Sequence, residues 1–177
     1  PPVNCKDVNG VYFFDRMLSW WSRYIGIDPE WKTPVRLDVK DGKIVKISGG
    51  YEAEAIQRFL THMEEKVGEG IWKFDTFHFG VHPNAKISEY ECPNPLHKRI
   101  IEHAHTSNLH VHIGSAGANE NYKYYTHITG DIRNATLKVG DTLVYEDGWL
   151  CCLDDPEVRK VEAKYPNLPG IPERWQR

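Results

Sequence analysis

Residues 35–50 read VRLDVKDGKIVKISGG, and residues 51–67 read YEAEAIQRFLTHMEEKV. In the first stretch, apolar and polar residues alternate on both sides of Lys40-Asp41-Gly42, which is typical of two antiparallel strands joined by a short turn. In the second stretch, apolar residues recur every three or four positions, as on one face of a helix. The two stretches therefore predict a hairpin over 35–47 and an amphipathic helix that covers a sheet.

The segments that follow predict further strands around this hairpin. Apolar and polar residues alternate again near Phe74, and short runs rich in β-branched residues recur towards the C-terminus. The predicted strands are 71–80, 108–114, 124–129, 134–139 and 142–150, and a short helix is predicted over 96–105. These elements indicate an α+β fold with a mixed, largely antiparallel or barrel-like sheet and one main covering helix.

The length and composition are those of one ordinary globular domain. The chain has 177 residues, of which 40% are hydrophobic, so it can bury a single core. The predicted domain covers residues 1–152. From residue 153 the composition becomes polar and rich in proline, which predicts an extended C-terminal arm over 153–177.

Charge argues against two classes of partner, and the cysteine content indicates a cellular compartment. The formal net charge is -3 and no long Lys/Arg block is present, so neither nucleic acid nor an anionic membrane is expected as a partner. The chain has neither an apolar run of membrane-spanning length nor a signal-peptide pattern. Its four cysteines include no CxxC pair, which favours a reducing compartment and predicts a cytoplasmic protein.

Histidines lie on several of the predicted strands. In LHVHI at 109–113, alternation places His110 and His112 on the face opposite Leu109, Val111 and Ile113. His78 lies near the end of an earlier predicted strand, and His127 follows the glycine-rich loop GSAGANE at 114–120. Imidazoles from separate segments are typical ligands of first-row transition metals, so this pattern predicts a metal site.

A structural role is the alternative for each of these histidines, because a single strand histidine is usually a core or surface residue with a satisfied hydrogen bond. That interpretation is favoured for His62, His82 and His97 and, less strongly, for His103, His105 and His110, which could form a polar face on helix and strand. His112 and His127 rank higher because they flank a loop whose glycines let the backbone approach a ligand.

Two carboxylates accompany the predicted metal site. Glu120 and Asp131 are the candidate catalytic groups, which would orient ligands, bind the metal or transfer protons. The alternative for each is a loop carboxylate that caps backbone amides. Neutral imidazole suits Fe(II), Zn(II), Cu(II) and Ni(II) alike, so the ligand type does not select the metal.

Four segments occur in an order that resembles a known fold family. They are VRLDVKDGKIVKISGG at 35–50, HFGVHPNAK at 78–86, HIGSAGANE at 112–120 and THITGDIRNATLKVGD at 126–141. In this order they resemble the C-terminal half of the fold shared by thermophilic leucyl aminopeptidases and 2,5-dihydroxypyridine dioxygenases. The similarity extends over roughly residues 8–150.

The resemblance implies a set of metal ligands. His78 falls on an iron-binding histidine of the dioxygenases, His127 on a metal-binding histidine of both groups, and His112 on a metal-binding histidine of the peptidases. Both groups have a metal-binding aspartate where this chain has Thr129, so His112 is expected to complete the set of His78, His112 and His127. Fe(II) is the expected metal, with Zn(II) or Mn(II) as alternatives.

The function implied by the resemblance is that of a mononuclear non-haem iron dioxygenase. Its substrate would be a small hydroxylated aromatic or N-heteroaromatic compound of the dihydroxypyridine type. The alternatives are a metal-dependent hydrolase of the aminopeptidase type and a non-catalytic subunit of a two-chain enzyme. Because the family has an additional N-terminal domain over the cleft, a second subunit that supplies this domain, or a homo-oligomer, is also expected.

Overall fold

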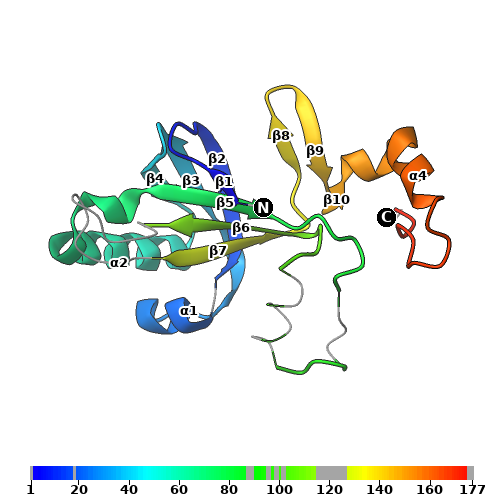
Figure 1. Cartoon of the computed structure of the whole chain (residues 1–177). Coiled ribbons are helices and arrows are strands. Elements are labelled where there is room, and N and C mark those ends of the chain that lie inside the picture. Colours follow the sequence, from blue (N-terminus) through cyan, green and yellow to red (C-terminus); the bar gives the residue numbers. More distant parts are fainter. Residues whose placement is uncertain are drawn as a thin grey trace. The chain divides into compact units, whose positions relative to one another are not determined.

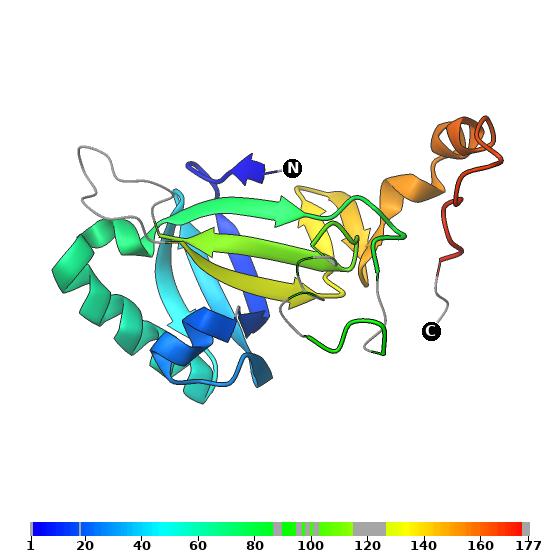
Figure 2. The same cartoon turned by 60° about the horizontal axis from the view of Figure 1, so that its bottom comes forward.

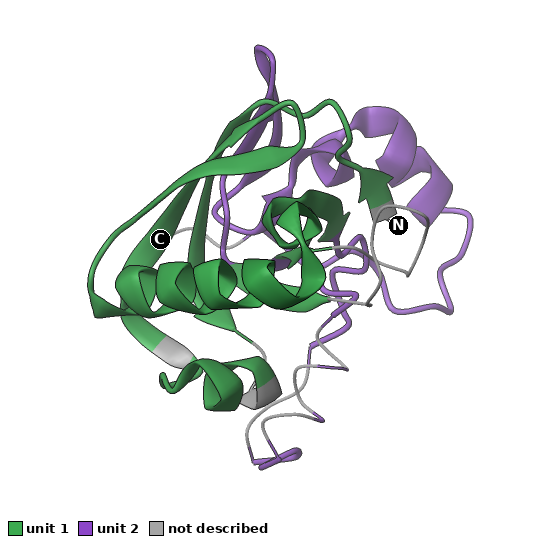
Figure 3. Ribbon diagram, turned by 90° about the vertical axis from the view of Figure 1, so that its left-hand side faces the viewer, with its two compact units in different colours: residues 1–78, 110–132 green, residues 79–109, 133–177 purple. Residues whose placement is uncertain are grey.

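The computed structural model describes residues 2–17, 19–86, 90–94, 97, 100, 103–114 and 127–174. The chain forms two compact units, shown in different colours in Figure 3. Unit 1 comprises residues 1–78 and 110–132, and unit 2 comprises residues 79–109 and 133–177. The predicted division into a domain over 1–152 and an arm over 153–177 stays a prediction.

The main sheet has seven strands in the order β1-β5-β6-β7-β2-β3-β4 (Figures 1 and 2). Neighbouring strands run antiparallel in four pairs: β1 with β5, β2 with β3, β2 with β7, and β3 with β4. The predicted α+β class is confirmed, and among the described residues the sheet does not close into a barrel. Its strands are β1 (Pro2–Asn4), β2 (Gly10–Met17), β3 (Glu30–Lys40), β4 (Lys43–Ser48), β5 (Phe74–Phe79), β6 (Asn108–Ile113) and β7 (Ile128–Arg133).

The predicted hairpin is confirmed as β3 and β4. Asp41 and Gly42 connect the two strands with φ angles of 49° and 69°, both in the left-handed region that the tight I′ hairpin turn requires. A Cβ atom on Gly42 would lie 2.3 Å from the carbonyl oxygen of Lys6, so only glycine fits at this position.

The predicted amphipathic helix is confirmed as α2 (Tyr51–Val67), which packs against β3 and β4. Its Ile56 and Leu60 are buried, as are Val35, Leu37 and Val39 on β3. Unit 1 also contains α1 (Ser19–Ile25) and the 3-10 helix η1 (Glu69–Trp72). Burial of these aliphatic side chains supplies the main driving force for folding this layer.

Unit 2 contains a second, three-stranded antiparallel sheet in the order β10-β9-β8. It is made by β8 (Leu137–Val139), β9 (Thr142–Glu146) and β10 (Trp149–Leu150), which confirms the predicted closing hairpin. The hydroxyl group of buried Tyr145 donates a hydrogen bond of 2.6 Å to the carbonyl oxygen of Gly80. This bond anchors the small sheet to the segment that follows β5.

The segment after β10 is more regular than the sequence indicates. The 3-10 helix η2 (Cys151–Asp154) is followed by α4 (Pro156–Glu162), and α4 lies within the segment 153–177 that was predicted to be extended. The Asp155 side chain accepts a 2.8 Å hydrogen bond from the Glu157 amide, and Pro156 occupies the first helical turn. Both are typical helix-start signals that the overall polar composition concealed. No helix in the described part of the chain is both long and apolar enough to cross a membrane.

Candidate metal centre

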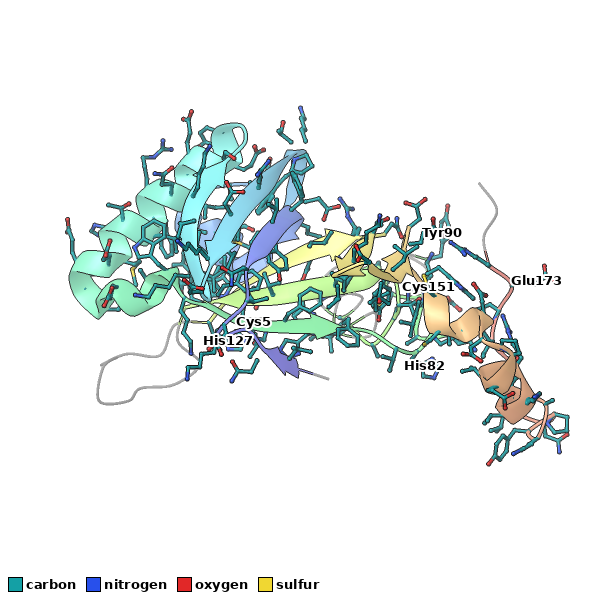
Figure 4. The ribbon with its side chains drawn as sticks, turned by 90° about the horizontal axis from the view of Figure 1, so that it is seen from above. Cys5, His82, Tyr90, His127, Cys151 and Glu173 are labelled. Atoms are coloured by element: carbon teal, nitrogen blue, oxygen red, sulfur yellow. The ribbon has the colours of Figure 1, made fainter. Side chains whose placement is uncertain are left out.

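The candidate site lies in unit 1 on the adjacent strands β5, β6 and β7. On β6, Leu109, Val111 and Ile113 are buried on one face, so His110 and His112 point to the other face. His78 lies near the end of β5, the neighbour of β6. His127 directly precedes β7, the neighbour on the other side, and is labelled in Figure 4.

The four imidazole rings form one cluster centred on His112. The His112 ring centroid lies 3.7 Å from that of His127, 4.5 Å from that of His78 and 5.2 Å from that of His110. The rings of His78 and His110 stack with their centroids 4.5 Å apart. Three distant segments of the chain therefore bring their histidines together.

The geometry of the cluster fits a metal ion. One ring nitrogen from each of His78, His110 and His112 can be chosen so that all three lie within 4.8 Å of one another. Three convergent imidazole nitrogens are a donor set that Fe(II), Zn(II) and Cu(II) accept. Of the predicted ligands, His78 and His112 belong to this group, and His127 contacts it through the ring of His112.

His110 joins this group although it is not among the three ligands predicted from the sequence. The alternation in LHVHI already places its side chain on the same face as His112. What one sequence does not contain is the pairing of β5 with β6, which brings His78 against His110.

Thr76 links two of the histidines. Its hydroxyl oxygen lies 2.9 Å from Nδ1 of His112 and 3.2 Å from Nε2 of His78. Thr76 is on β5, two residues before His78, so the hydroxyl connects histidines of neighbouring strands. Hydrogen bonds of this kind orient histidine ligands in metal sites.

Burial favours the neutral form of His78 and His127. It lowers the pKa of His78 and the pKa of His127 below their ordinary value of 6.5. For His78, the neighbouring His127 lowers the pKa further, while Asp75 opposes both effects. Neutral imidazole is the form that binds metal, so this environment prepares the cluster for a cation near neutral pH.

Of the two carboxylates predicted to be catalytic, the structure describes Asp131 but not Glu120. Asp131 on β7 is fully buried, and its Oδ2 atom lies 3.4 Å from Nε of Arg16 on β2, so it forms an ion pair across the two strands. Its role in proton transfer stays a prediction. Glu120 lies outside the described residues.

The fold and the histidine cluster together define the class: an α+β protein with a candidate metal site on one face of its sheet. A model of the family described as NicX, 2,5-dihydroxypyridine 5,6-dioxygenase, matches residues 23–152, so the chain belongs to this family. The match includes the four histidines of the cluster. The dioxygenase part of the predicted resemblance is therefore confirmed, while the link to leucyl aminopeptidases stays a prediction.

The fold is similar to that of a solved structure, the 2,5-dihydroxypyridine dioxygenase from Pseudomonas putida. The TM-score is 0.59 at 17% sequence identity, and the similarity covers 82% of this chain. The chain spans 40% of the length of that protein. No match was found among curated proteins.

Proposed function

We propose that this chain carries the metal site of a dioxygenase that opens hydroxylated aromatic or N-heteroaromatic rings of the dihydroxypyridine type. The family match over residues 23–152 supports the reaction class. The histidine cluster on β5, β6 and β7 is the observation that carries the proposal to particular residues. Without that cluster, the family match alone would leave the chain without an assigned metal site.

The metal in this proposal is Fe(II), held by His78 and His112 together with a third imidazole. The third ligand is His127, which the sequence predicts, or His110, which the geometry adds. Bound iron would supply the one-electron chemistry that lets dioxygen react with an aromatic ring. Zn(II) and Mn(II) fit the same nitrogen atoms and remain the alternatives.

An all-histidine site affects which substrates bind. Neutral ligands leave a divalent metal with one more unit of positive charge than two histidines and a carboxylate would. This charge favours a substrate that binds as an anion, such as a ring with an ionised hydroxyl group. Removal of that hydroxyl proton is the step proposed for Asp131 or Glu120.

The substrate cleft is proposed to need more polypeptide than this chain provides. The chain spans 40% of the length of its structural neighbour. We therefore propose that a second subunit, or a second copy of this chain, completes the site. Analytical ultracentrifugation of the purified chain tests the second copy, and a strictly monomeric chain would contradict that part of the proposal.

Oxygen uptake tests the proposed reaction. The protein is prepared without added metal, loaded anaerobically with Fe(II), and mixed with 2,5-dihydroxypyridine in an oxygen electrode. Substrate loss should match oxygen uptake one for one, because a dioxygenase inserts both oxygen atoms into its product. Neither the Zn(II) form nor the His112→Ala variant should consume oxygen.

Two results would contradict the proposal. One is an iron-loaded protein, in the oligomeric state it adopts, that binds the substrate and consumes no oxygen. The other is turnover under strict anoxia with Zn(II) or Mn(II), which would favour the hydrolase alternative.

A further inference from the structure

We propose that Thr76 is a positioning residue that sets which ring nitrogen is protonated in both His78 and His112. This inference rests on the proposed metal site and names a residue that determines its donor atoms. Thr76 is half-buried on β5, and its hydroxyl oxygen is within hydrogen-bond distance of Nδ1 of His112 and Nε2 of His78. One hydroxyl group thus contacts one ring nitrogen of each of two histidines.

The number of protons on the two rings and the hydroxyl group limits how these hydrogen bonds can form. A neutral imidazole has one N–H donor and one nitrogen lone pair, and a threonine hydroxyl donates one hydrogen bond and accepts two. If Thr76 donated its proton to either ring, the other nitrogen of that ring would carry the ring proton. The only lone pair of that ring would then accept the hydrogen bond from Thr76, so the ring would have none left to bind a metal.

While both hydrogen bonds to Thr76 are kept, both histidines can bind a metal only if both donate to Thr76. Nδ1 of His112 and Nε2 of His78 then carry the protons, with distances to Oγ1 of 2.9 Å and 3.2 Å. The other nitrogen of each ring, Nε2 of His112 and Nδ1 of His78, then carries no proton and is the atom that would donate its lone pair to the metal. Thr76 would therefore fix opposite tautomers in two neighbouring histidines, which a residue serving only to fill space would not do.

The first test measures the tautomers directly in the metal-free, full-length chain. Long-range 1H–15N correlation spectra of protein labelled with 15N-histidine, at about pH 8 where imidazoles are neutral, report the protonated nitrogen of each ring. The His78→Gln and His112→Gln variants assign the two signals. We expect the proton on Nδ1 in His112 and on Nε2 in His78.

The second test compares substitutions at position 76. Thr76→Val preserves the shape of the side chain and removes the hydroxyl, so His112 should lose its preference for the Nδ1 proton. Metal affinity, measured by competition with a chromophoric chelator, should fall by about 10- to 100-fold. Thr76→Ser retains the hydroxyl and should restore both the tautomer and the affinity.

Thr136→Val is the matched control. The hydroxyl oxygen of Thr136, just before β8, accepts a 3.2 Å hydrogen bond from the amide of Asp147, between β9 and β10. This variant loses a threonine hydrogen bond of a structural kind, so it should change neither the tautomers nor the metal affinity.

The outcomes distinguish this inference from the proposed function. A wild-type spectrum with the proton on Nε2 of His112 overturns the inference, whether or not Thr76→Val folds. So does an unchanged His112 tautomer in a folded Thr76→Val protein. Neither measurement uses oxygen or an aromatic substrate, so an inactive protein with the expected tautomers would refute only the proposed reaction.

Discussion

His112 is the histidine on which the cluster depends, because its ring contacts those of His78, His110 and His127. We expect His112→Ala to lower bound metal from near one ion per chain to a small fraction of that value. This substitution also removes the hydrogen bond between His112 and Thr76. Elemental analysis of protein prepared without added metal measures the change, and His62→Ala on the exposed face of α2 is the control. Equal metal content in the two variants would contradict the assignment.

His110 and His127 compete for the place of third ligand. One ring nitrogen of His110 lies within 4.8 Å of a ring nitrogen of His78 and of His112, whereas His127 contacts the group through the His112 ring. We therefore expect His110→Ala to weaken metal binding more than His127→Ala does. Titration of both variants with Co(II), followed by its visible absorption, gives the two affinities. The reverse order would favour the ligand set predicted from the sequence.

The lowered pKa values of His78 and His127 predict how the stability of the metal-free chain depends on pH. The ordinary value is 6.5, and both folded-state values lie below it, so the unfolded chain binds more protons in the interval between them. The resulting stability is present above pH 6.5 and is lost as the pH falls through 6.5 towards the folded-state values.

Urea unfolding in the presence of a chelator, at several values between about pH 8 and pH 5.5, measures this dependence. The free energy of unfolding should decrease on acidification, and the double variant His78→Gln/His127→Gln should show a weaker decrease. A double variant with an unchanged pH dependence would assign the effect to other groups.

Strand β7 is held against β2 through a close contact at Gly130. A Cβ atom at this position would lie 2.7 Å from ring carbons of Phe14, which is fully buried. Gly130→Ala must displace that ring, so we expect a loss of about 1 to 3 kcal/mol in the free energy of unfolding. Denaturant unfolding measures it.

Gly10→Ala on β2 is the control for Gly130→Ala. The nearest atom to its added Cβ would be a Tyr12 ring carbon at 3.6 Å, an ordinary contact. Its effect should stay within about 0.5 kcal/mol. Equal effects of the two substitutions would show that the Phe14 ring accommodates the methyl group.

Helices and strands that depend only on nearby residues could be predicted from the sequence. The β3–β4 hairpin follows from alternation around Asp41-Gly42, and α2 follows from the helical spacing of its apolar residues. Helix α4 was missed because a two-residue cap signal was hidden in a polar, proline-rich segment. In each case the information lies within a few residues of the element itself.

The site was predictable only in part, because its geometry depends on strands distant in sequence. Strand positions, the glycine-rich loop and the family resemblance led to the prediction of His78, His112 and His127 as ligands, which stays a prediction. The contact of His78 with His110 and the hydrogen bonds of Thr76 depend on the register of β5 against β6, which one sequence does not specify.

The two units share continuous strands, which determines how the whole chain should unfold. Most of β5, β6 and β7 belongs to unit 1, while Phe79, Asn108, Leu109 and Arg133 belong to unit 2. Because these strands carry the histidine cluster, opening them would remove the metal site and break elements of both units. We therefore expect one cooperative thermal transition, which metal shifts to higher temperature.

The size of that shift follows from mass action. A metal that binds only the folded chain adds about 2.7 kcal/mol of stability when its free concentration is 100 times its Kd. Circular dichroism and tryptophan fluorescence, recorded in parallel melts with and without metal, should give coincident transitions that move together. His112→Ala should melt in one transition that metal does not move, since it loses the site and keeps the shared strands. Two separate transitions, of which metal moves only one, would mean that the units unfold independently despite their continuous strands.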